Sequence, residues 1–320
     1  MKKLCTLLAL IMLLTCVPMT GCTAEPEQDS APQQDSAPQP NPASDFEYAV
    51  NDLGAITIQK YIGTADEAII PREIEGKEVV TIGSRAFENS TVRTILLPDT
   101  LKSIGERAFL QCTALESIDL SMSSMTQIGK YAFYGCSALR NVTFGDNITR
   151  IADYAFYKCI SLEKAHLPKS LTTLGTGAFA YCTWLRSVTI PKTLTEWGTS
   201  VFKADYSLLE LNLEDGLQSI GVGAFMNCAS LPSVTLPASI TSVGSQAFSS
   251  TSALWDVIFE GDAPTIGTNA FSSAISYVPY LYYSPDTSGW DTVTLSESHR
   301  LLPIAERENN PNPMNNMPSY

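Results

Sequence analysis

Hydrophobic positions recur along most of this chain with a period of about 23 residues. The pair Ala-Phe, once replaced by Val-Phe, stands at residues 86–87, 108–109, 132–133, 155–156, 178–179, 201–202, 224–225, 247–248 and 270–271. Nine copies in phase are typical of a repeat architecture, in which each repeat buries its apolar edges against its neighbours. The pattern therefore predicts a β-rich repeat solenoid of nine rungs.

Within each repeat, the order of apolar and polar residues predicts a strand, a turn, a second short extended run and a helical turn. The run that contains Leu185, Val188 and Ile190 alternates inward and outward positions, as a strand with one buried face does. Pro191 ends this strand, because proline cannot donate to a ladder. The Gly-x-x-Ala-Phe segment is too short for a lasting helix and predicts a helical or 3-10 turn. We expect the stacked rungs to form a single parallel sheet along one face, with strands about 4.8 Å apart.

The exposed strand positions give an independent indication of this stacking. The residue that follows the first apolar position of each strand alternates in charge along five rungs: Arg93, Glu116, Arg140, Glu163 and Arg186. If the rungs stack in register, opposite charges face each other on adjacent strands, and each pair stabilises the stack by a few tenths of a kcal/mol.

These repeats resemble the BspA-type leucine-rich repeat of bacterial surface proteins. One copy reads Leu162-x-x-Ala-x-Leu-Pro-x-x-Leu171-x-x-Leu174-Gly-x-x-Ala-Phe179-x-x-Cys182, and the resemblance covers about 245 of the 320 residues. Residues 46–80 and 272–302 resemble the family's entry segment and its closing strand with Trp290, and would cap the two ends of the core. The resemblance implies adhesion or host and matrix binding as a common role, although a fold does not enforce a function.

The N-terminus has the pattern of an export signal. Lys2 and Lys3 precede an apolar stretch of fourteen residues, 4–17, which is too short to span a membrane comfortably. The sequence that follows resembles the lipobox of bacterial lipoproteins, with Met19 in the place where that motif usually has Leu. The resemblance implies a signal peptide at 1–21 and a lipid on Cys22, which would anchor the protein to the outer face of a bacterial membrane, at the cell surface. The alternative is an ordinary secretory signal with an incidental cysteine.

Residues 22–45 predict a tether between this anchor and the repeats. The segment Gln-Asp-Ser-Ala-Pro-Gln occurs twice, at 28–33 and 34–39, and the stretch carries five acids and no base. Such a segment cannot bury enough apolar surface to fold. We therefore expect an acidic, Pro/Gln/Ser-rich disordered tether at 22–45, a solenoid at 46–302 and a disordered tail at 303–320.

Composition narrows the classes of function. The formal net charge of −13 makes nucleic acid an unfavourable partner, because the phosphates would repel the chain. His166 and His299 are the only histidines, and His166 stands at an exposed strand position. No Gly-x-Ser-x-Gly motif and no phosphate-binding glycine loop is present. We therefore expect no catalytic residues, no metal and no cofactor.

Five repeat cysteines share one position, three residues after the phenylalanine: Cys112, Cys136, Cys159, Cys182 and Cys228. Other rungs hold Ser90, Asp205 and Thr251 there, so this position favours a small buried group and the cysteines are interpreted as free structural thiols. Disulfides between adjacent rungs, or metal binding, are the alternatives for an exported protein.

Aromatic residues are the feature that departs most from the repeat. They flank the Ala-Phe pair in three consecutive rungs: Tyr131, Tyr134, Tyr154, Tyr157, Tyr181 and Trp184. Such a cluster could stack against sugar rings or anchor a protein partner. The alternative is that the rings stack on one another and shield the core.

The sequence thus favours a monomeric, surface-anchored binding or adhesion module without turnover, whose partner is a protein or a carbohydrate. A structural envelope spacer without a specific ligand is a second hypothesis, and a hydrolase accessory domain is a third. A hydrolase would need a concave pocket with a perturbed carboxylate or histidine, which the sequence does not indicate.

Overall fold

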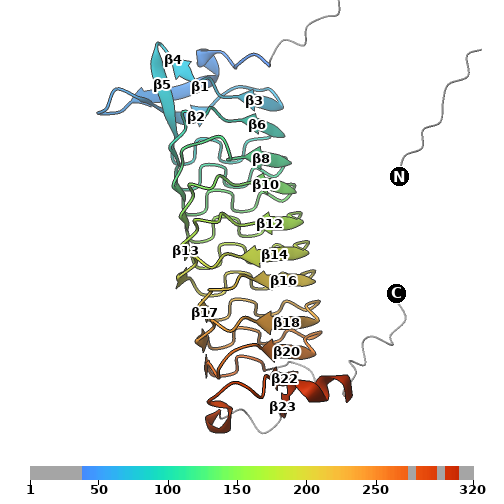
Figure 1. Cartoon of the computed structure of the whole chain (residues 1–320). Helices are drawn as coiled ribbons and strands as arrows, with labels where there is room; N and C mark the ends of the chain where they lie inside the picture. Colours follow the sequence, from blue (N-terminus) through green and yellow to red (C-terminus); the bar gives the residue numbers. More distant parts are fainter. Residues whose placement is uncertain (1–37, 273–278, 294–299, 310–320) are drawn as a thin grey trace, which may run out of the picture. The chain divides into compact units, whose positions relative to one another are not determined.

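The computed structural model describes residues 38–272, 279–293 and 300–309, and they form a β-solenoid of about ten turns with repeats of about 23 residues (Figure 1). The predicted leader, Cys22, residues 22–37 of the predicted tether and His299 lie outside the described residues. The described residues contain no helix that is long and apolar enough to span a membrane. The predicted fold class is confirmed, and the turn additional to the nine predicted comes from the N-terminal cap.

One face of the solenoid carries a ladder of parallel strands of three or four residues, which we call the long-strand ladder. Each strand forms where alternate apolar side chains point into the core, as the burial of Val188 and Ile190 illustrates. The strands are β3 (Glu67–Ile69), β6 (Thr94–Leu96), β8 (Ser117–Asp119), β10 (Asn141–Thr143), β12 (Lys164–His166), β14 (Ser187–Ile190), β16 (Glu210–Leu213), β18 (Ser233–Leu236), β20 (Asp256–Phe259), β22 (Tyr280–Tyr283) and β23 (Arg300–Pro303).

A second ladder, the short-strand ladder, runs along a different side of the stack (Figure 1). Its strands are β2 (Ile56–Tyr61), β5 (Lys77–Ile82), β7 (Ser103–Ile104), β9 (Gln127–Ile128), β11 (Arg150–Ile151), β13 (Thr173–Leu174), β15 (Glu196–Trp197), β17 (Ser219–Ile220), β19 (Ser242–Val243) and β21 (Thr265–Ile266). The prediction of a single sheet is therefore wrong. Two-residue strands are too short to show alternation in the sequence, and they pair because stacking brings the same offset of successive repeats together.

The third side of each rung is the Gly-x-x-Ala-Phe segment, and the stacked segments form what we call the turn column. The expected helical or 3-10 turn is wrong here, because the segment is a chain of tight turns. Around Phe87, alternate amides bond within the rung and to the next one: Ala86 N–H donates to Gly83 at 3.3 Å, and Phe87 N–H donates to Ala108 at 2.7 Å. This alternation requires left-handed backbone, as at Arg85 (φ 60°) and Asn89 (φ 59°).

The core is a column of stacked phenylalanines along the solenoid axis. The rings from Phe87 to Phe271 lie 5.0 to 5.6 Å apart between centroids, and each is at most 2% exposed. The N-terminal cap extends the column: Tyr61 in β2 stacks on Phe87 at 5.0 Å, and Phe46 in β1 (Phe46–Val50) packs against Tyr61. Strand β1 pairs antiparallel with β2, and β4 (Glu73–Ile74) pairs antiparallel with β5, so the cap ends the parallel stacking.

The folded part of the chain extends further at both ends than the sequence predicts. At the N-terminal end, the predicted tether stops short of residue 45, because Asn41 bonds to Ile69 through both backbone and side chain and η1 (Ala43–Asp45) follows. At the C-terminal end, Trp290 in η2 (Trp290–Thr292) is 7% exposed and stacks on Tyr283 at 5.3 Å, as expected for a cap.

The predicted start of a disordered tail at residue 303 is also wrong. Residues 304–309 form η3 (Ile304–Asn309), and Arg307 Nε donates to the Asp256 carboxylate at 2.9 Å. The ion pair holds this segment against β20. No periodic pattern predicts this contact, because it joins residues 51 positions apart. Residues 310–320 lie outside the described part.

Both ladders are interrupted at one common boundary, between the rung of Phe202 and the rung of Phe225, and the long-strand ladder is also interrupted between β10 and β12. In the described residues, β16 and β18 belong to different sheets, and so do β15 and β17. The turn column alone is continuous there, with Phe202 N–H donating to Ala224 at 2.8 Å. Two residues explain the interruption, one on each face.

On the long-strand side, the cause is Pro232. In neighbouring rungs the amide at this position donates to the preceding rung, as Leu209 N–H does to Arg186 at 2.9 Å. Proline has no N–H, so the carbonyl of Leu209 lacks this donor. On the short-strand side, Trp197 replaces a smaller residue and leans over the next rung: a Cβ added to Gly221 would lie 2.5 Å from Trp197 Cβ.

Candidate functional site on the turn column

The backbone of the turn column presents aromatic side chains at its outer edge. Tyr131 and Tyr154 precede the Ala-Phe pair and adopt left-handed backbone, with φ of 56° and 55°. Because the hydrogen bonds of the turns fix this conformation in every rung, the side chains at equivalent positions project side by side. Tyr134 and Tyr157 follow the phenylalanine of the same two rungs.

These four residues, Tyr131, Tyr134, Tyr154 and Tyr157, form a compact unit that we call the tyrosine block. Between rungs, Tyr131 stacks on Tyr154 at 5.2 Å with a 7° interplanar angle, and Tyr134 stacks on Tyr157 at 5.0 Å with a 13° angle. Within each rung the two rings meet edge to face, at 5.8 and 5.6 Å. The separation of the rungs matches the distance at which rings stack, so the solenoid holds the block rigid.

Cationic side chains surround the tyrosine block. Arg107 and Lys130 lie over the Tyr131 ring at 5.1 and 5.3 Å from its centroid, and Lys158 lies 5.7 Å from that of Tyr157. Lys130 also pairs with Asp153 at 3.5 Å. Burial raises the pKa of Tyr157, and the neighbouring tyrosines raise it further, so this ring stays un-ionised at neutral pH. Arg107 in turn pairs with Glu106 at 2.9 Å, so two of these three cations already have a carboxylate partner.

The structure brings together five of the six aromatic residues singled out in the sequence. Tyr181 joins the tyrosine block through Tyr157, with centroids 5.3 Å apart and rings tilted by 59°. Trp184 is 59% exposed and has no ring contact among the described residues. Stacking of the tyrosines, which was the alternative interpretation, is present, but the rings are only half-buried and so remain available to a ligand.

A hollow of about 310 Å³ opens where the tyrosine block ends. In the next rung Gly177 and Ala180 replace the tyrosine pair, and a Cβ on Gly177 would lie 2.8 Å from Tyr154 Cε1. We call this cavity the tyrosine hollow; it is lined by Tyr154, Tyr157, Thr176, Gly177, Ala180, Tyr181, Thr199, Ser200 and Lys203. Rings, hydroxyls and one ammonium thus converge, whereas this lining lacks the pair of carboxylates that glycosidases use.

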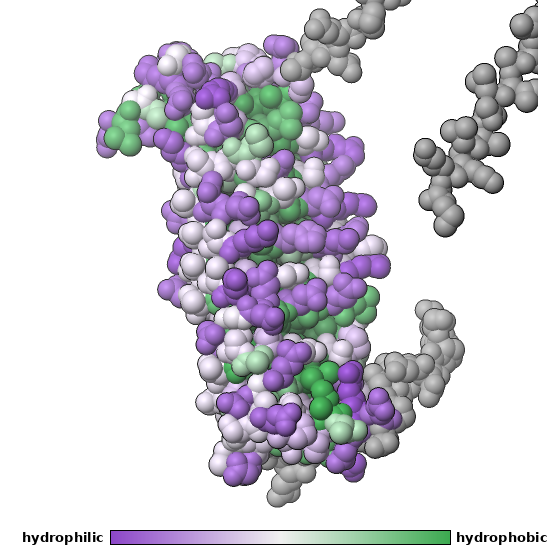
Figure 2. All heavy atoms as spheres, viewed as in Figure 1, coloured by the Kyte–Doolittle hydropathy of each residue, from purple (hydrophilic) through white to green (hydrophobic). Residues whose placement is uncertain are grey.

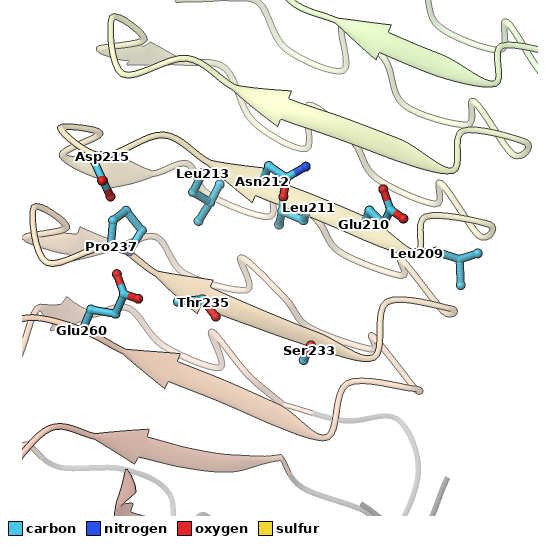
Figure 3. Close-up of a pocket in the computed structure, with 10 residues that line it drawn as sticks. All are labelled: Leu209, Glu210, Leu211, Asn212, Leu213, Asp215, Ser233, Thr235, Pro237 and Glu260. Carbon is cyan, nitrogen blue, oxygen red and sulfur yellow. The ribbon is translucent and has the colours of Figure 1, made fainter. Parts of the chain in front are cut away.

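A second hollow, of about 420 Å³, lies in the interruption between β16 and β18. We call it the sheet slot. Figure 3 shows Glu210 and Leu209 at one end of the slot, with Asp215 and Glu260 near Pro237 at the other. Leu211, whose equivalents are buried in other rungs, is half-buried here because β18 has moved away. The surface in Figure 2 is otherwise mainly hydrophilic or intermediate, with small hydrophobic areas.

The repeat cysteines line the interior beside the phenylalanine column, and all five are buried free thiols. Each donates to the carbonyl of the phenylalanine one rung earlier, at distances from 2.9 Å (Cys112 to Phe87) to 3.3 Å (Cys182 to Phe156). Thr251 makes the same bond with its hydroxyl at 3.1 Å. The position therefore requires a small donor, which explains why cysteine, serine and threonine interchange there.

Asp205 is the exception in this column. It is fully buried; its Oδ1 accepts the amide of Cys182 at 2.8 Å, but its Oδ2 has no hydrogen-bond partner. Burial raises the pKa of Asp205 well above its ordinary value, although the bond from Cys182 acts in the opposite direction. Burial also raises the pKa of the Cys182 and Cys228 thiols. The sequence marked position 205 as part of the column but did not reveal that its carboxyl lacks a partner.

The described residues contain no group of three His, Cys, Asp or Glu side chains placed to hold a metal ion. His166 is exposed on β12, as expected of a surface position. Along the row of alternating charges, Arg93 and Glu116 form an ion pair within the part of the chain that the structure describes.

The repeats were compared with known proteins. A family model described as the BspA type leucine rich repeat region matches residues 80–209 and 199–280, in six copies. Its two matched segments meet at the rung of Phe202, where the repeat is least regular. A search of curated proteins found no match.

Several solved structures are similar to this chain. A leucine-rich repeat protein of T. pallidum is 25% identical, with 73% of this chain and 88% of that one covered and a TM-score of 0.48. A leucine-rich repeat protein from Bacteroides ovatus is 20% identical, covering 84% and 99% of the two chains, with a TM-score of 0.46. A leucine rich cell surface protein from Faecalibacterium prausnitzii is 20% identical, covering 82% and 99%, with a TM-score of 0.40.

Proposed function

Since the chain belongs to the BspA-type leucine-rich repeat family, we propose that it is a non-catalytic binding module displayed at a bacterial cell surface. A solenoid suits this role, because its stacked rungs form a rigid surface on which neighbouring repeats contribute to one site. The contact surface is the tyrosine block with Tyr181, and the partner is a protein or a glycan.

The observation that supports this proposal most directly is the geometry of the tyrosine block. Its four half-buried rings lie on the outer edge in two parallel stacks, and equivalent positions in other rungs hold Arg107, Ser200 or Met226. Core stability does not require these rings, because the same turn forms in the other rungs without them. Rigid, amphipathic rings on a fixed backbone lose little entropy when they bind a partner.

Display at the surface rests on the N-terminal sequence. The export signal and Cys22 imply a lipid anchor, and the acidic segment that follows would hold the solenoid away from the membrane. Both the anchor and the tether are parts of the proposal.

The test is an array of glycans and extracellular-matrix proteins probed with the purified full chain. We expect a specific signal that disappears when Tyr131, Tyr134, Tyr154 and Tyr157 are all changed to Ser. Tyr206→Ser is the matched control, since Tyr206 is an exposed tyrosine outside the block. A thermal melt of each variant separates loss of binding from loss of fold.

Either of two outcomes would contradict the proposal. A signal that survives the fourfold variant would remove the tyrosine block from the site. No signal from the unchanged protein would favour the structural spacer instead.

A further inference from the structure

The tyrosine hollow has features that define its ligand more closely than the tyrosine block does. One rung supplies two rings to the hollow, Tyr154 and Tyr157, and the next rung adds Tyr181 beside them. Gly177 and Ala180 form the floor, because a third tyrosine pair is missing from the stack. The open side of the last ring is therefore a place where a further flat, partly apolar ring could stack.

Polar groups also line the hollow. The hydroxyls of Thr176, Thr199 and Ser200 line it and can each donate and accept hydrogen bonds. A sugar ring combines an apolar C–H face with hydroxyls at its rim, so it complements a ring on one side and hydroxyls on the other. A volume of about 310 Å³ is at the lower end for ligand pockets and suits one sugar residue rather than a long chain.

The positive charge at the hollow favours an anionic sugar over a neutral one. Lys203 lines the hollow and has no ion-pair partner among the described residues. Arg107, Lys130 and Lys158 lie along the same edge. Arg107 pairs with Glu106 and Lys130 with Asp153, so Lys203 supplies the unpaired charge in the hollow, whose lining contains no carboxylate. An ammonium without a partner in a recess favours an anionic group, and a charge-assisted hydrogen bond is about twice as strong as a neutral one.

We propose that the tyrosine hollow binds a terminal sugar that carries a carboxylate, with its ring against Tyr154 and its carboxylate at Lys203. This inference rests on the proposed binding function, and it specifies the class of ligand that binds beside the tyrosine block. A single acidic sugar fits better than a polyanion, because the chain as a whole carries a net charge of −13 and repels extended negative charge.

The test compares three ligands in calorimetric titrations of the full chain: an oligosaccharide that ends in a carboxylated sugar, its methyl ester, and an oligosaccharide that carries a sulfate but no carboxylate. We expect the carboxylate form to bind at least about tenfold more tightly than the ester, as the loss of a charged hydrogen bond implies. Lys203→Gln should lower the affinity for the carboxylate form to that for the ester, and Lys203→Arg should restore part of it. Lys192→Gln, at an exposed lysine outside the hollow, should leave both affinities unchanged.

The outcomes separate this inference from the function on which it rests. Equal affinity for acid and ester, with both lost in Tyr154→Ser, would overturn the carboxylate assignment while leaving the binding function in place. Tighter binding of the sulfated ligand would also overturn it. Carboxylate binding that Lys203→Gln does not weaken would move the site elsewhere. Failure of all three ligands to bind in the titrations would overturn the carboxylate assignment alone, and silence on the array as well would overturn both proposals.

Discussion

At the scale of single residues, one chemical requirement explains the interior column beside the phenylalanines. Among the described residues, six phenylalanine carbonyls accept a hydrogen bond from the next rung, and a thiol or a hydroxyl supplies it, as at Cys159 and Thr251. Buried polar groups that lack partners destabilise a fold, so the small donors recur at this position. Asp205 breaks the rule, because an ionised carboxylate can accept but not donate.

Asp205→Asn should stabilise the protein at neutral pH. The amide keeps the acceptor for Cys182 N–H and adds a donor for the carbonyl of Phe179, so we expect a gain of about 1–3 kcal/mol in unfolding free energy. Because the pKa of Asp205 is raised in the folded state, the carboxyl penalises folding once the pH exceeds the ordinary aspartate pKa of about 3.9. The advantage of Asn should therefore shrink as the pH falls from 7 to 4.

Urea unfolding of both proteins at several pH values measures this difference. Asp52→Asn, at an exposed aspartate, is the control and should change little. A gain that does not depend on pH would mean that the carboxyl is not the source of the effect.

At the scale of elements, the solenoid is not uniform along its length. The long- and short-strand ladders are both interrupted between the rungs of Phe202 and Phe225, and the sheet slot opens there. Within one sheet a pair such as Leu120 N–H to Thr143 C=O, at 2.8 Å, joins consecutive long strands. The equivalent pair across the slot is Leu213 and Thr235, and their strands are in different sheets. This boundary is where we expect the stack to open most easily.

Pro232→Leu should close the slot. Leucine has a backbone N–H that can donate to the carbonyl of Leu209, and the substitution changes no charge. We expect the amide of Leu213 to exchange with solvent at least about tenfold more slowly, as one added hydrogen bond implies. The midpoint of thermal unfolding should change little. Removal of proline raises the conformational entropy of the unfolded chain, which costs about 0.4–1 kcal/mol of stability and offsets the gain from the added hydrogen bond.

Hydrogen exchange of the peptide that contains β16 measures this effect. Pro191→Leu removes a proline next to an intact pair of strands and should leave Leu213 unchanged. Unaltered exchange in Pro232→Leu would assign the interruption to Trp197 on the other face instead.

At the scale of the whole molecule, the two ends of the solenoid cover the core that a stack of repeats leaves open. An open stack would expose the phenylalanine column, and the N-terminal hairpin with Phe46 covers one end while Trp290 covers the other. The core is therefore closed within the described residues, and the outer surface is left for partners.

Cys22→Ala should release the protein from membranes into the soluble fraction of the expressing bacterium. The reason is that a lipidated cysteine is the anchor that the N-terminal sequence implies, and stable anchoring requires acyl chains. Fractionation followed by immunoblotting measures it. Cys16→Ala, a change within the predicted leader, should leave the protein in the membrane fraction, and retention of Cys22→Ala would contradict the anchor.

Parts of the candidate site could be read from the sequence, and parts could not. The tyrosines at 131, 134, 154 and 157 were visible as departures from the repeat, since equal offsets in successive rungs must lie side by side. Trp184, at a different offset, was grouped with them in the sequence but makes no ring contact. The tyrosine hollow depends on Gly177 and Ala180, which are ordinary residues in the sequence and matter only because rings stand beside them.

The sequence by itself determined the period, the identity of the core column and the positions that share an edge. The physical reason is that in a solenoid each residue contacts its equivalent one repeat away, so a spacing of about 23 residues translates directly into contact. Tertiary structure alone decided the pairing of the second extended runs into a ladder of their own, the slot at Pro232, the unpartnered oxygen of Asp205 and the order of residues 304–309. These features depend on which hydrogen-bond partner a group finds in the folded stack, and a missing partner or a contact 51 positions away leaves no periodic trace.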